Sequence, residues 1–402
     1  MSVNTLNFEQ VSTVLTSIVQ QATNQTILTP TDTGSFVSVA QVALRADRDS
    51  VMQAISNILA RTIFSIRPYE AKFKGLDMDT FRWGGMMRKL SIADSDWDDD
   101  EAYDYPIFYD AGQTPPDGEG LSIDRWKIKK PNVLQTNFYG QSVYADHMTI
   151  TEDQLETAFT GPEQLGSFIS LLMTNLSNRL EMSNESLRRG LVCNAIAALY
   201  EENATDRVIH LLTEYNTLTG LSLTSQTVYD PANFPAFCKW VYSRVAEITD
   251  LFTANSTMFQ TVITGKPILR HTPYEYQKVY LFAPFQRQME ARVLADAYHD
   301  NYLKYADVET VPFWQSISAR DSVKATPAYV DNTGTLVTST AQTVEPVFGL
   351  IFDRDAMGMT ITDRRVLSTP LNESGLYRNI WVHGKQRIVF DNTEKVALLL
   401  LD

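Results

Sequence analysis

Closely spaced carboxylates are the feature of this sequence that comes nearest to a chemical site. They form the run Asp94-Ser95-Asp96-Trp97-Asp98-Asp99-Asp100-Glu101-Ala102-Tyr103-Asp104. Oxygen ligands at alternate positions are typical of a calcium loop, but such a loop also needs a glycine at its sixth position and a bidentate glutamate at its twelfth. Here those positions hold Asp99 and Tyr105. The run therefore predicts a solvated acidic projection, or one that meets a basic surface, rather than a metal site.

Basic and aromatic residues surround this acidic run and predict a contact between subunits. Complementary charge from another copy of the chain would come from Arg88, Lys89, Lys127, Lys129 and Lys130. Aromatic side chains are enriched at protein interfaces because their rings bury a large area at a low cost in rotamer entropy. The candidate inter-subunit contacts are Arg88, Lys89, Trp97, Asp98, Asp99, Asp100, Tyr103, Tyr109, Lys129 and Lys130.

A glycosidase is the enzymatic alternative for the same segment. Its sugar-stacking platforms would be Trp83, Trp97, Tyr103 and Tyr109, with nearby aspartates as acid and base. Aromatic and acidic residues in an extended hairpin serve more often as interface contacts, so the sequence favours the structural interpretation.

Motifs for other chemistry are absent from the sequence. The histidines are too widely spaced for two imidazoles to share one helical face and bind zinc: His147, His210, His271, His299 and His383. Cys193 and Cys238 are too far apart for a zinc ribbon, and no nucleophile elbow, Walker loop or dinucleotide fingerprint occurs. We therefore expect no catalytic residue, no metal and no cofactor. A hydrolase stays an alternative, because a nucleophile and a base can converge from distant positions.

Composition and charge narrow the class of protein. The chain has 402 residues, 44% of them hydrophobic, which is enough for a sizeable core. A net charge of −14 argues against a protein whose main task is to hold phosphate backbones, since that task needs lysine and arginine. The two cysteines lie among apolar residues, which indicates buried, reduced thiols. No export signal and no membrane-length apolar stretch is present, so we expect neither export nor membrane insertion.

The element that dominates the rest of the chain is one long helix, predicted from about Pro162 to about Glu201. Thr160 and Glu163 have the spacing of a capping box at its start. Apolar residues recur at spacing four in two groups: Phe168, Leu172, Leu176 and Leu180, then Leu187, Leu191, Ala195 and Leu199. Such a helix would be roughly 60 Å long and would serve as a rigid spine. Gly190 predicts a bend, because glycine inside a helix costs about 1 kcal/mol relative to alanine.

The segments before this helix read as an arm and a hairpin. Residues 1–65 begin with polar residues and hold few large apolar ones before Val37, so we expect an arm that gains order by lying on another surface. Residues 67–130 read as extended, with a Gly/Pro-rich tip at 112–120, which indicates a long projecting hairpin.

The segments after the long helix complete an α+β protein whose helices and strands are segregated along the chain. We expect strands and turns over residues 203–232, a helix from Asn233 and another from Pro284. Mostly strands follow from Thr326, and the last is a buried strand within Val396–Leu401.

Three stretches, which follow one another in order along the chain, resemble a known family. They are Lys130-Pro131-Asn132-Val133, the segment from Thr149 to Phe159 with Glu152-Asp153-Gln154-Leu155-Glu156-Thr157-Ala158-Phe159, and Phe168-Ile169 opening the long helix. The series is similar to the major capsid protein of small podoviruses of the Picovirinae type, which are tailed bacteriophages. A weaker similarity to the same family lies in Gly375-Leu376-Tyr377-Arg378-Asn379-Ile380-Trp381-Val382.

The resemblance implies the Hong Kong 97-type major capsid protein fold, an α+β fold. This fold has an N-terminal arm, an extended loop, a peripheral domain with a spine helix, and an axial domain. The corresponding segments here would be residues 1–65 for the arm, 66–135 for the extended loop, 136–234 for the peripheral domain, 235–370 for the axial domain and 371–402 for the closing strands.

The resemblance also implies a function. The protein would be the structural coat protein that self-assembles into the icosahedral head of a tailed bacteriophage around double-stranded DNA. Its partners would be further copies in hexamers and pentamers, a separate scaffolding protein, a portal, and packaged DNA as a neighbour that is not read by sequence. It would reside in the virion capsid after assembly in the host bacterial cytoplasm. The alternatives are another virion or tail-associated structural protein and a virion-borne hydrolase.

Overall fold

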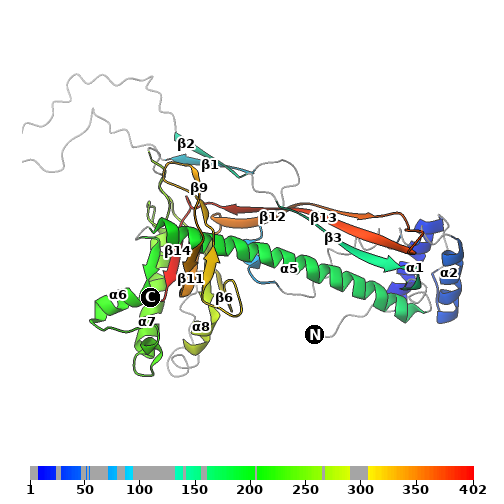
Figure 1. The fold of residues 1–402 in the computed structure, drawn as a ribbon, viewed down its shortest axis with the longest axis horizontal. Helices are drawn as coiled ribbons and strands as arrows, with labels where there is room; N and C mark the ends of the chain where they lie inside the picture. The colour runs from blue at the N-terminus through cyan, green and yellow to red at the C-terminus, as the bar shows by residue number, and fades with distance from the viewer. Residues whose placement is uncertain are drawn as a thin grey trace, which may run out of the picture.

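The computed structural model describes residues 8–23, 29–46, 51, 54, 71–78, 87–93, 132–138, 142–154, 161–203, 206–264, 268–289 and 307–402. The longest element of this part of the chain is the 41-residue helix α5 (Pro162–Glu202). One sheet lies along α5 toward its N-terminal end, and a second sheet with its helices is gathered at its C-terminal end (Figure 1). The molecule is therefore elongated, with α5 as its spine.

The helix α5 is the long helix that the sequence predicts. Its N-cap is Gly161 rather than Thr160, which lies outside the described residues, and no side-chain hydrogen bond caps it. Pro162 at the first helical position starts the helix instead, because it lacks an N–H to satisfy and its φ already suits a helix. The helix passes through Gly190 without interruption and ends at Asn203, whose backbone is left-handed with a φ of 45°. The helix is therefore unbroken at Gly190, where the sequence predicts a bend.

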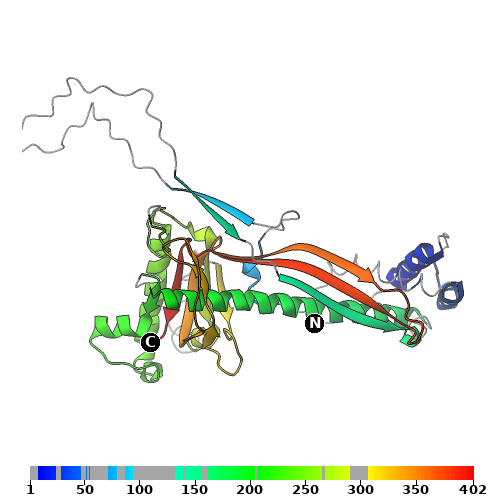
Figure 2. The same cartoon turned by 45° about the horizontal axis from the view of Figure 1, so that its top comes forward.

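A three-stranded antiparallel sheet lies along the spine. Its strands, in spatial order, are β12 (Met357–Ser368), β13 (Tyr377–Phe390) and β3 (Ser142–Thr151). Side chains of β3 and β13 alternate between an inner and an outer face, and the inner face packs Val382 against Leu176 and Leu180 of α5. Figure 2 shows the three strands following the helix for much of its length. Strands that precede α5 and strands that follow it in the sequence are therefore needed to cover this face of the spine.

A mixed five-stranded sheet lies at the C-terminal end of α5. Its strands, in spatial order, are β4 (Val208–His210), β14 (Val396–Leu400), β11 (Val347–Asp353), β5 (Gln277–Phe282) and β6 (Asp307–Val311). Every residue of β11 and β14 is buried, so both faces of the sheet are covered. The buried strand predicted at Val396–Leu401 is confirmed, and it is an inner strand of this sheet.

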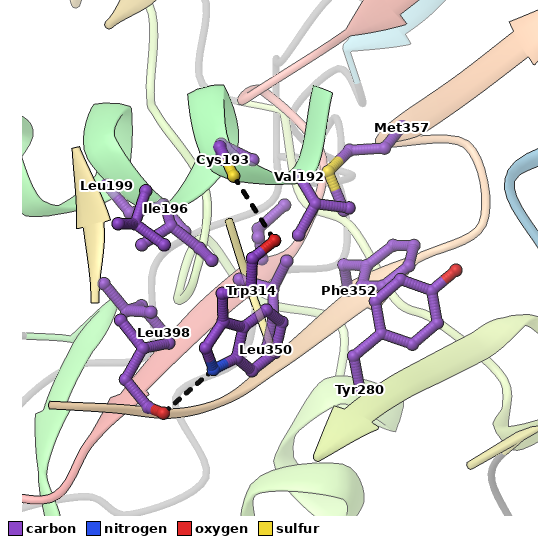
Figure 3. Packing of buried hydrophobic residues seen from close by; sticks show 14 of the residues in the cluster. Val192, Cys193, Ile196, Leu199, Tyr280, Trp314, Leu350, Phe352, Met357 and Leu398 are labelled. Carbon is purple, nitrogen blue, oxygen red and sulfur yellow. Dashed lines mark hydrogen bonds between the residues drawn. The ribbon is translucent and has the colours of Figure 1, made fainter. Parts of the chain in front are cut away.

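The face of this sheet that meets the spine forms one hydrophobic core. Val192 and Ile196 of α5 pack with Leu350 of β11 in the same buried cluster, around the fully buried Trp314 (Figure 3). The Sγ atom of Cys193 lies 3.8 Å from the Trp314 carbonyl oxygen, which accepts its weak hydrogen bond. Burial raises the pKa of the Cys193 thiol to about 11. Both cysteines are buried and free, as the sequence predicts.

Three helices lie against the other face of the sheet: α6 (Leu211–Thr219), α7 (Phe234–Thr253) and α8 (Ala283–Met289). The start of α7 is as predicted, with Asn233 at the N-cap and a proline in the first turn. The helix α6 corrects the expectation of strands and turns over residues 203–232. Leu211, Leu212 and Tyr215 fall on one helical face and are buried, and this burial outweighs the weak local preference of the segment.

The helices α1 (Phe8–Thr23) and α2 (Thr33–Ala46) lie at the far tip of the long sheet (Figure 1). Val11, Leu15 and Ile18 of α1 are at most 2% exposed, and they share a core with Ile150 of β3. The helix α1 thus gains order by lying on another surface, as expected, and that surface is the tip of the same chain. Its apolar residues are few, but their spacing of three and four places them on one face, which the tip of the same chain covers.

The remaining strands form three short antiparallel pairs. They are β1 (Met87–Ala93) with β2 (Asn132–Phe138), β7 (Val323–Ala325) with β10 (Gln342–Val344), and β8 (Ala328–Val330) with β9 (Leu336–Thr338). No described helix is both long and apolar enough to cross a membrane.

Replacing Gly190 with alanine is expected to raise the free energy of unfolding by about 1 kcal/mol, the difference in helix propensity between the two residues. A Cβ atom at Gly190 would have no neighbouring heavy atom within 4 Å, so the gain is not offset by a clash. The matched control is Gly349→Ala, where a Cβ would lie 2.9 Å from the Tyr280 carbonyl oxygen and should destabilise the chain. Urea denaturation of both variants measures the two effects. The same sign in both would contradict this account of the spine.

Candidate subunit interface and its anchor

The ribbon formed by β1 and β2 flanks residues 94–131, the segment that holds most of the predicted subunit contacts. Figure 2 shows this ribbon standing off the rest of the described structure, which we call the body. Its two strands pair only with each other among the described strands. Because an isolated two-stranded ribbon is marginally stable in water, we expect side-chain contacts with the rest of the structure to stabilise it.

The two faces of β1 differ in chemistry, because successive side chains of a strand point to opposite faces. Lys89 and Ser91 point toward the body of the molecule, where both are hydrogen-bonded. Leu90 and Ile92 point away from it and are 61% and 63% exposed. Val133 of β2, paired with Ile92, is 44% exposed. The ribbon therefore presents an aliphatic outer face to the surroundings.

Four charged groups hold the inner face of the ribbon, and we call Lys89, Arg270, Asp391 and Glu394 the ribbon anchor. The Lys89 ammonium donates to Asp391 Oδ2 at 2.7 Å and to the Glu394 carboxylate. The Arg270 guanidinium also donates to Glu394, and its Nη2 donates to the Ser91 hydroxyl oxygen at 3.1 Å. Two cations thus balance two carboxylates that are themselves buried.

Burial and charge act differently on the two carboxyl groups. At Glu394, burial raises the pKa above its ordinary value, because it outweighs the opposing effects of Lys89 and Arg270. At Asp391, burial is again the largest single effect and also raises the pKa. The Lys89 ammonium and hydrogen bonds from Thr393 together outweigh it and hold the pKa of that carboxyl below its ordinary value. As the pH falls, Glu394 therefore loses its charge before Asp391 does.

The two carboxylates belong to a buried polar turn between β13 and β14. Its residues are Asp391, Asn392, Thr393, Glu394 and Lys395, none more than 7% exposed. The Asn392 amide donates to the Val330 carbonyl oxygen at 2.7 Å and to the Thr261 hydroxyl oxygen at 2.8 Å. The Lys395 ammonium donates to the Ala254 carbonyl oxygen at 2.7 Å, at the end of α7. One turn thus joins the ribbon to several parts of the body.

Arg207 connects the end of the spine to the same turn. Its side chain is 1% exposed, and it donates to the Glu202 carboxylate, to the Thr261 hydroxyl oxygen at 2.6 Å and to the Asn392 carbonyl oxygen at 3.3 Å. Glu202 is the last residue of α5, so charge-assisted hydrogen bonds connect the turn to the end of the spine.

The segment just before the ribbon, residues 71–78, is held to the spine directly. Arg188 of α5 donates two hydrogen bonds of 2.8 Å to the carboxylate of Asp77, a bidentate pair. Glu309 of β6 accepts the Phe73 N–H at 2.8 Å. Residues 71–78 are therefore fixed both to α5 and to the five-stranded sheet.

Two of the predicted contacts, Arg88 and Lys89, lie in the described part of the chain. Arg88 is exposed on the outer face of β1. Lys89 was predicted to offer its charge to another copy, and here its ammonium pairs with Asp391 and Glu394 of its own chain. The other predicted contacts lie outside the described residues: Trp97, Asp98, Asp99, Asp100, Tyr103, Tyr109, Lys129 and Lys130. Their role stays a prediction.

Sequence reasoning missed the anchor and its turn, namely Asp391, Glu394 and Arg270 with Arg207 and Lys395. A signal was present, since residues 391–395 are five consecutive polar residues directly before the apolar strand β14. A polar turn is normally taken as solvated. Only the fold shows that this one is buried.

The described residues show no arrangement typical of an enzyme site. They include no group of three or more His, Cys, Asp or Glu side chains that could hold a metal ion. A hollow of about 340 Å³ lies between β3 and α5, lined by Tyr144, Ala145, Asp146, Arg179, Leu180, Met182 and Ser183. Its two charged groups, Asp146 and Arg179, pair with each other.

The chain has the Hong Kong 97-type capsid protein fold. A chain in the capsid structure of Staphylococcus phage Andhra has 10% sequence identity and a TM-score of 0.50, over 84% of this chain and 87% of that chain. A chain in the structure of the head fiber and inner core protein gp22 of native bacteriophage P68 has 11% identity and a TM-score of 0.49, with coverages of 84% and 87%. At such identities the first similarity shows the fold alone.

The chain belongs to the family of Phi29-like phage major capsid proteins, whose family model matches residues 15–399. No curated protein matches it. The family confirms the resemblance drawn from the sequence. The protein is thus a structural coat protein of a tailed phage, and it assembles into the oligomeric shell of the virion capsid.

Proposed function

We propose that this chain self-assembles through hexamers and pentamers into an icosahedral head that encloses double-stranded DNA. The observation that carries the proposal is the contrast between a rigid spine and a ribbon that stands off it with an aliphatic outer face. A shell subunit needs several moderate contacts with different neighbours, and weak contacts add when they act together. A spine and a projecting ribbon supply such contacts better than one pocket would.

The domain roles follow from the same proposal. Residues 1–65 act as the arm, 66–135 as the extended loop, 136–234 as the peripheral domain, 235–370 as the axial domain and 371–402 as closing strands. The long sheet supports one refinement, because β12 and β13 lie beside β3 on the spine. We therefore assign residues 357–390 to the peripheral unit as well.

The proposed partners are a separate scaffolding protein, a portal and packaged DNA, with assembly in the host bacterial cytoplasm. The net charge of −14 supports DNA as a neighbour rather than a tightly held ligand. We further propose that the chain is not an enzyme. Turnover of a polysaccharide that is lost on substitution of a single aspartate, histidine or serine would contradict that part of the proposal.

Electron microscopy of the purified full chain, alone and co-expressed with candidate scaffolding proteins from the same genome, tests the proposed function. Closed icosahedral particles are the expected result. Rings, tubes or persistent monomers under both conditions would contradict it and would favour a tail-associated structural protein or a virion-borne hydrolase.

Reversing the charge of Asp98, Asp99 and Asp100 to lysine is expected to reduce the yield of closed shells several-fold. The proposal pairs this acidic run with basic residues of a neighbouring copy, and like charges facing each other oppose association. The control reverses Glu247, a charged residue of α7 far along the chain from this run. Shell yields counted by electron microscopy measure the effect, and an unchanged yield would count against the pairing.

A further inference from the structure

We propose that Lys89 is a positioning residue for assembly: through Asp391 and Glu394 it holds the β1–β2 ribbon in the direction that lets neighbouring copies close a shell. The inference rests on the proposed function, since it concerns how the ribbon is aimed for shell contacts. Lys89 is thereby assigned a role inside its own subunit.

Among the described residues, the ribbon has few other ties to the body. Its backbone hydrogen bonds within the described strands join β1 to β2. The side-chain hydrogen bonds that reach the body come from Lys89 and Ser91, two neighbouring positions on one face. Leu134 of β2, paired with Ser91, lines the same small hollow as Arg270 and Thr393. The inner face of the ribbon is therefore fixed mainly by charge.

Removing the Lys89 ammonium would do more than delete one hydrogen bond. Asp391 and Glu394 are buried side by side, and Lys89 is the cation that contacts both of them. Without it, two buried carboxylates face the ribbon with Arg270 as their remaining cationic neighbour. A buried charge left without its partner is strongly unfavourable. The contact between the ribbon and the turn that carries the two carboxylates would therefore be lost rather than merely weakened.

The direction of the ribbon and the folding of the body depend on different bonds. The turn that carries the two carboxylates is held by bonds that do not involve Lys89. Thr393 donates its hydroxyl and its N–H to Asp391 Oδ1 at 2.6 Å and 3.0 Å, and Asn392 bonds Val330 and Thr261. The turn and the five-stranded sheet should therefore persist without Lys89, while the ribbon becomes free to change direction.

The anchor also responds to pH through Glu394. The charged groups that face Glu394 are Lys89 from β1, Arg270 from the segment before β5, and Asp391 from its own turn. Because burial raises the pKa of Glu394, acidification removes this carboxylate first and leaves Lys89 with Asp391 alone. An acid whose pKa is raised on folding does not lower stability when it is neutralised. Glu394→Gln should thus loosen the ribbon at neutral pH without destabilising the body.

Hydrogen exchange and shell yield of the full chain test the inference together. In Lys89→Met, the backbone amides of β1 and β2 are expected to exchange about tenfold faster, while those of β11 and β14 are unchanged. The yield of closed shells should fall several-fold, and Lys89→Arg should restore both readings. Arg244→Met, which removes the cation between Glu214 and Glu247 on α6 and α7, is the matched control and should change neither.

Three results would overturn the inference. The first is a Lys89→Met chain whose ribbon exchanges faster but whose shells form at the wild-type yield. The second is faster exchange in β11 and β14 as well, which would mean a role in the whole fold. The third is a pH profile of shell yield that is the same in Glu394→Gln as in the wild type. Failure of the proposed function is seen separately, as absence of closed shells from the wild-type chain before any variant is compared.

Discussion

Replacing Trp314 with alanine is expected to lower the free energy of unfolding by about 3–5 kcal/mol, the range for removing a large aromatic side chain from a core. Trp314 is fully buried where the spine meets the five-stranded sheet, beside Cys193 and Ile196 (Figure 3). Its indole N–H donates to the Val347 carbonyl oxygen at 3.0 Å. The substitution would leave a cavity where α5 packs on the five-stranded sheet. It would also leave the buried Val347 carbonyl oxygen without this hydrogen bond.

Urea denaturation followed by circular dichroism measures this loss. Trp314→Phe keeps most of the ring and loses the hydrogen bond, so it should cost about 1–3 kcal/mol. Trp381→Ala is the matched control: this tryptophan is half-buried on the outer face of the long sheet, stacked on His147 at 4.4 Å between ring centroids. Its removal should cost the least of the three. A Trp314→Ala chain as stable as the wild type would contradict the packing described for this core.

Replacing Lys395 with methionine is expected to lower the free energy of unfolding at pH 7 by about 2–3 kcal/mol, the cost of leaving buried polar groups without a partner. The ammonium is fully buried and donates to the Ala254 carbonyl oxygen at 2.7 Å, to the Phe252 carbonyl oxygen at 3.1 Å and to the Ser256 hydroxyl oxygen at 3.2 Å. It is a cation at the C-terminal end of α7, where the helix dipole favours positive charge. Methionine fills the same volume but makes none of these bonds.

The pH dependence of stability should also change in this variant. Burial lowers the pKa of Lys395 to about 8, while in the unfolded chain it titrates near its ordinary pKa of 10.5. Between these values the unfolded chain binds more protons, so this lysine makes the folded state more stable as the pH rises from 8 toward 10.5. The stability difference between wild type and Lys395→Met should therefore grow over that window.

Denaturation at pH 7.5 and at pH 10 measures this change. Comparing variants cancels the opposing effect of Cys193, whose thiol titrates in both chains. Lys239→Met, at an exposed position of α7, should leave both the stability and its pH dependence unchanged. A difference between wild type and Lys395→Met that is constant with pH would show that the ammonium is not held as described.

Trp314 and Lys395 together keep the interior of the subunit rigid, while its contacts with other subunits remain moderate. Trp314 joins the spine to the sheet through apolar packing, and Lys395 ties α7 to the turn that seats the ribbon. Leaving such buried polar groups without a partner costs stability, and their bonds also depend strongly on geometry. We expect the bonds of Lys395 to fix where the ribbon stands as well as to stabilise the fold.

Much of the secondary structure could be predicted because it depends on local periodicity. The apolar spacing that ends in Leu199 predicted α5, and the apolar run at the C-terminus predicted β14. The helix α6 was missed because a nine-residue segment carries too weak a pattern to distinguish a helix from strands and turns. For the helix α1 the sequence did not tell which surface would order it, and the structure shows that the tip of the same chain does so.

The candidate site could be predicted only in part. The sequence placed Arg88 and Lys89 next to an acidic, aromatic segment and assigned both to contacts with another copy. The structure pairs Lys89 with Asp391 and Glu394, some three hundred residues away along the chain. No periodicity in one sequence joins positions so distant, because the pairing depends on how β1 and the β13–β14 turn meet.

The sequence by itself determined the α+β class, the long spine, the buried closing strand and the resemblance to phage coat proteins. These features follow from the order and spacing of apolar residues and from short recognisable stretches, which are properties of the chain read locally. The tertiary structure alone decided that the charged turn 391–395 is buried and that Lys89 belongs to it. Burial and ion pairing depend on which distant surfaces meet, and a charged residue has the same local pattern whether it faces water or a partner inside the fold.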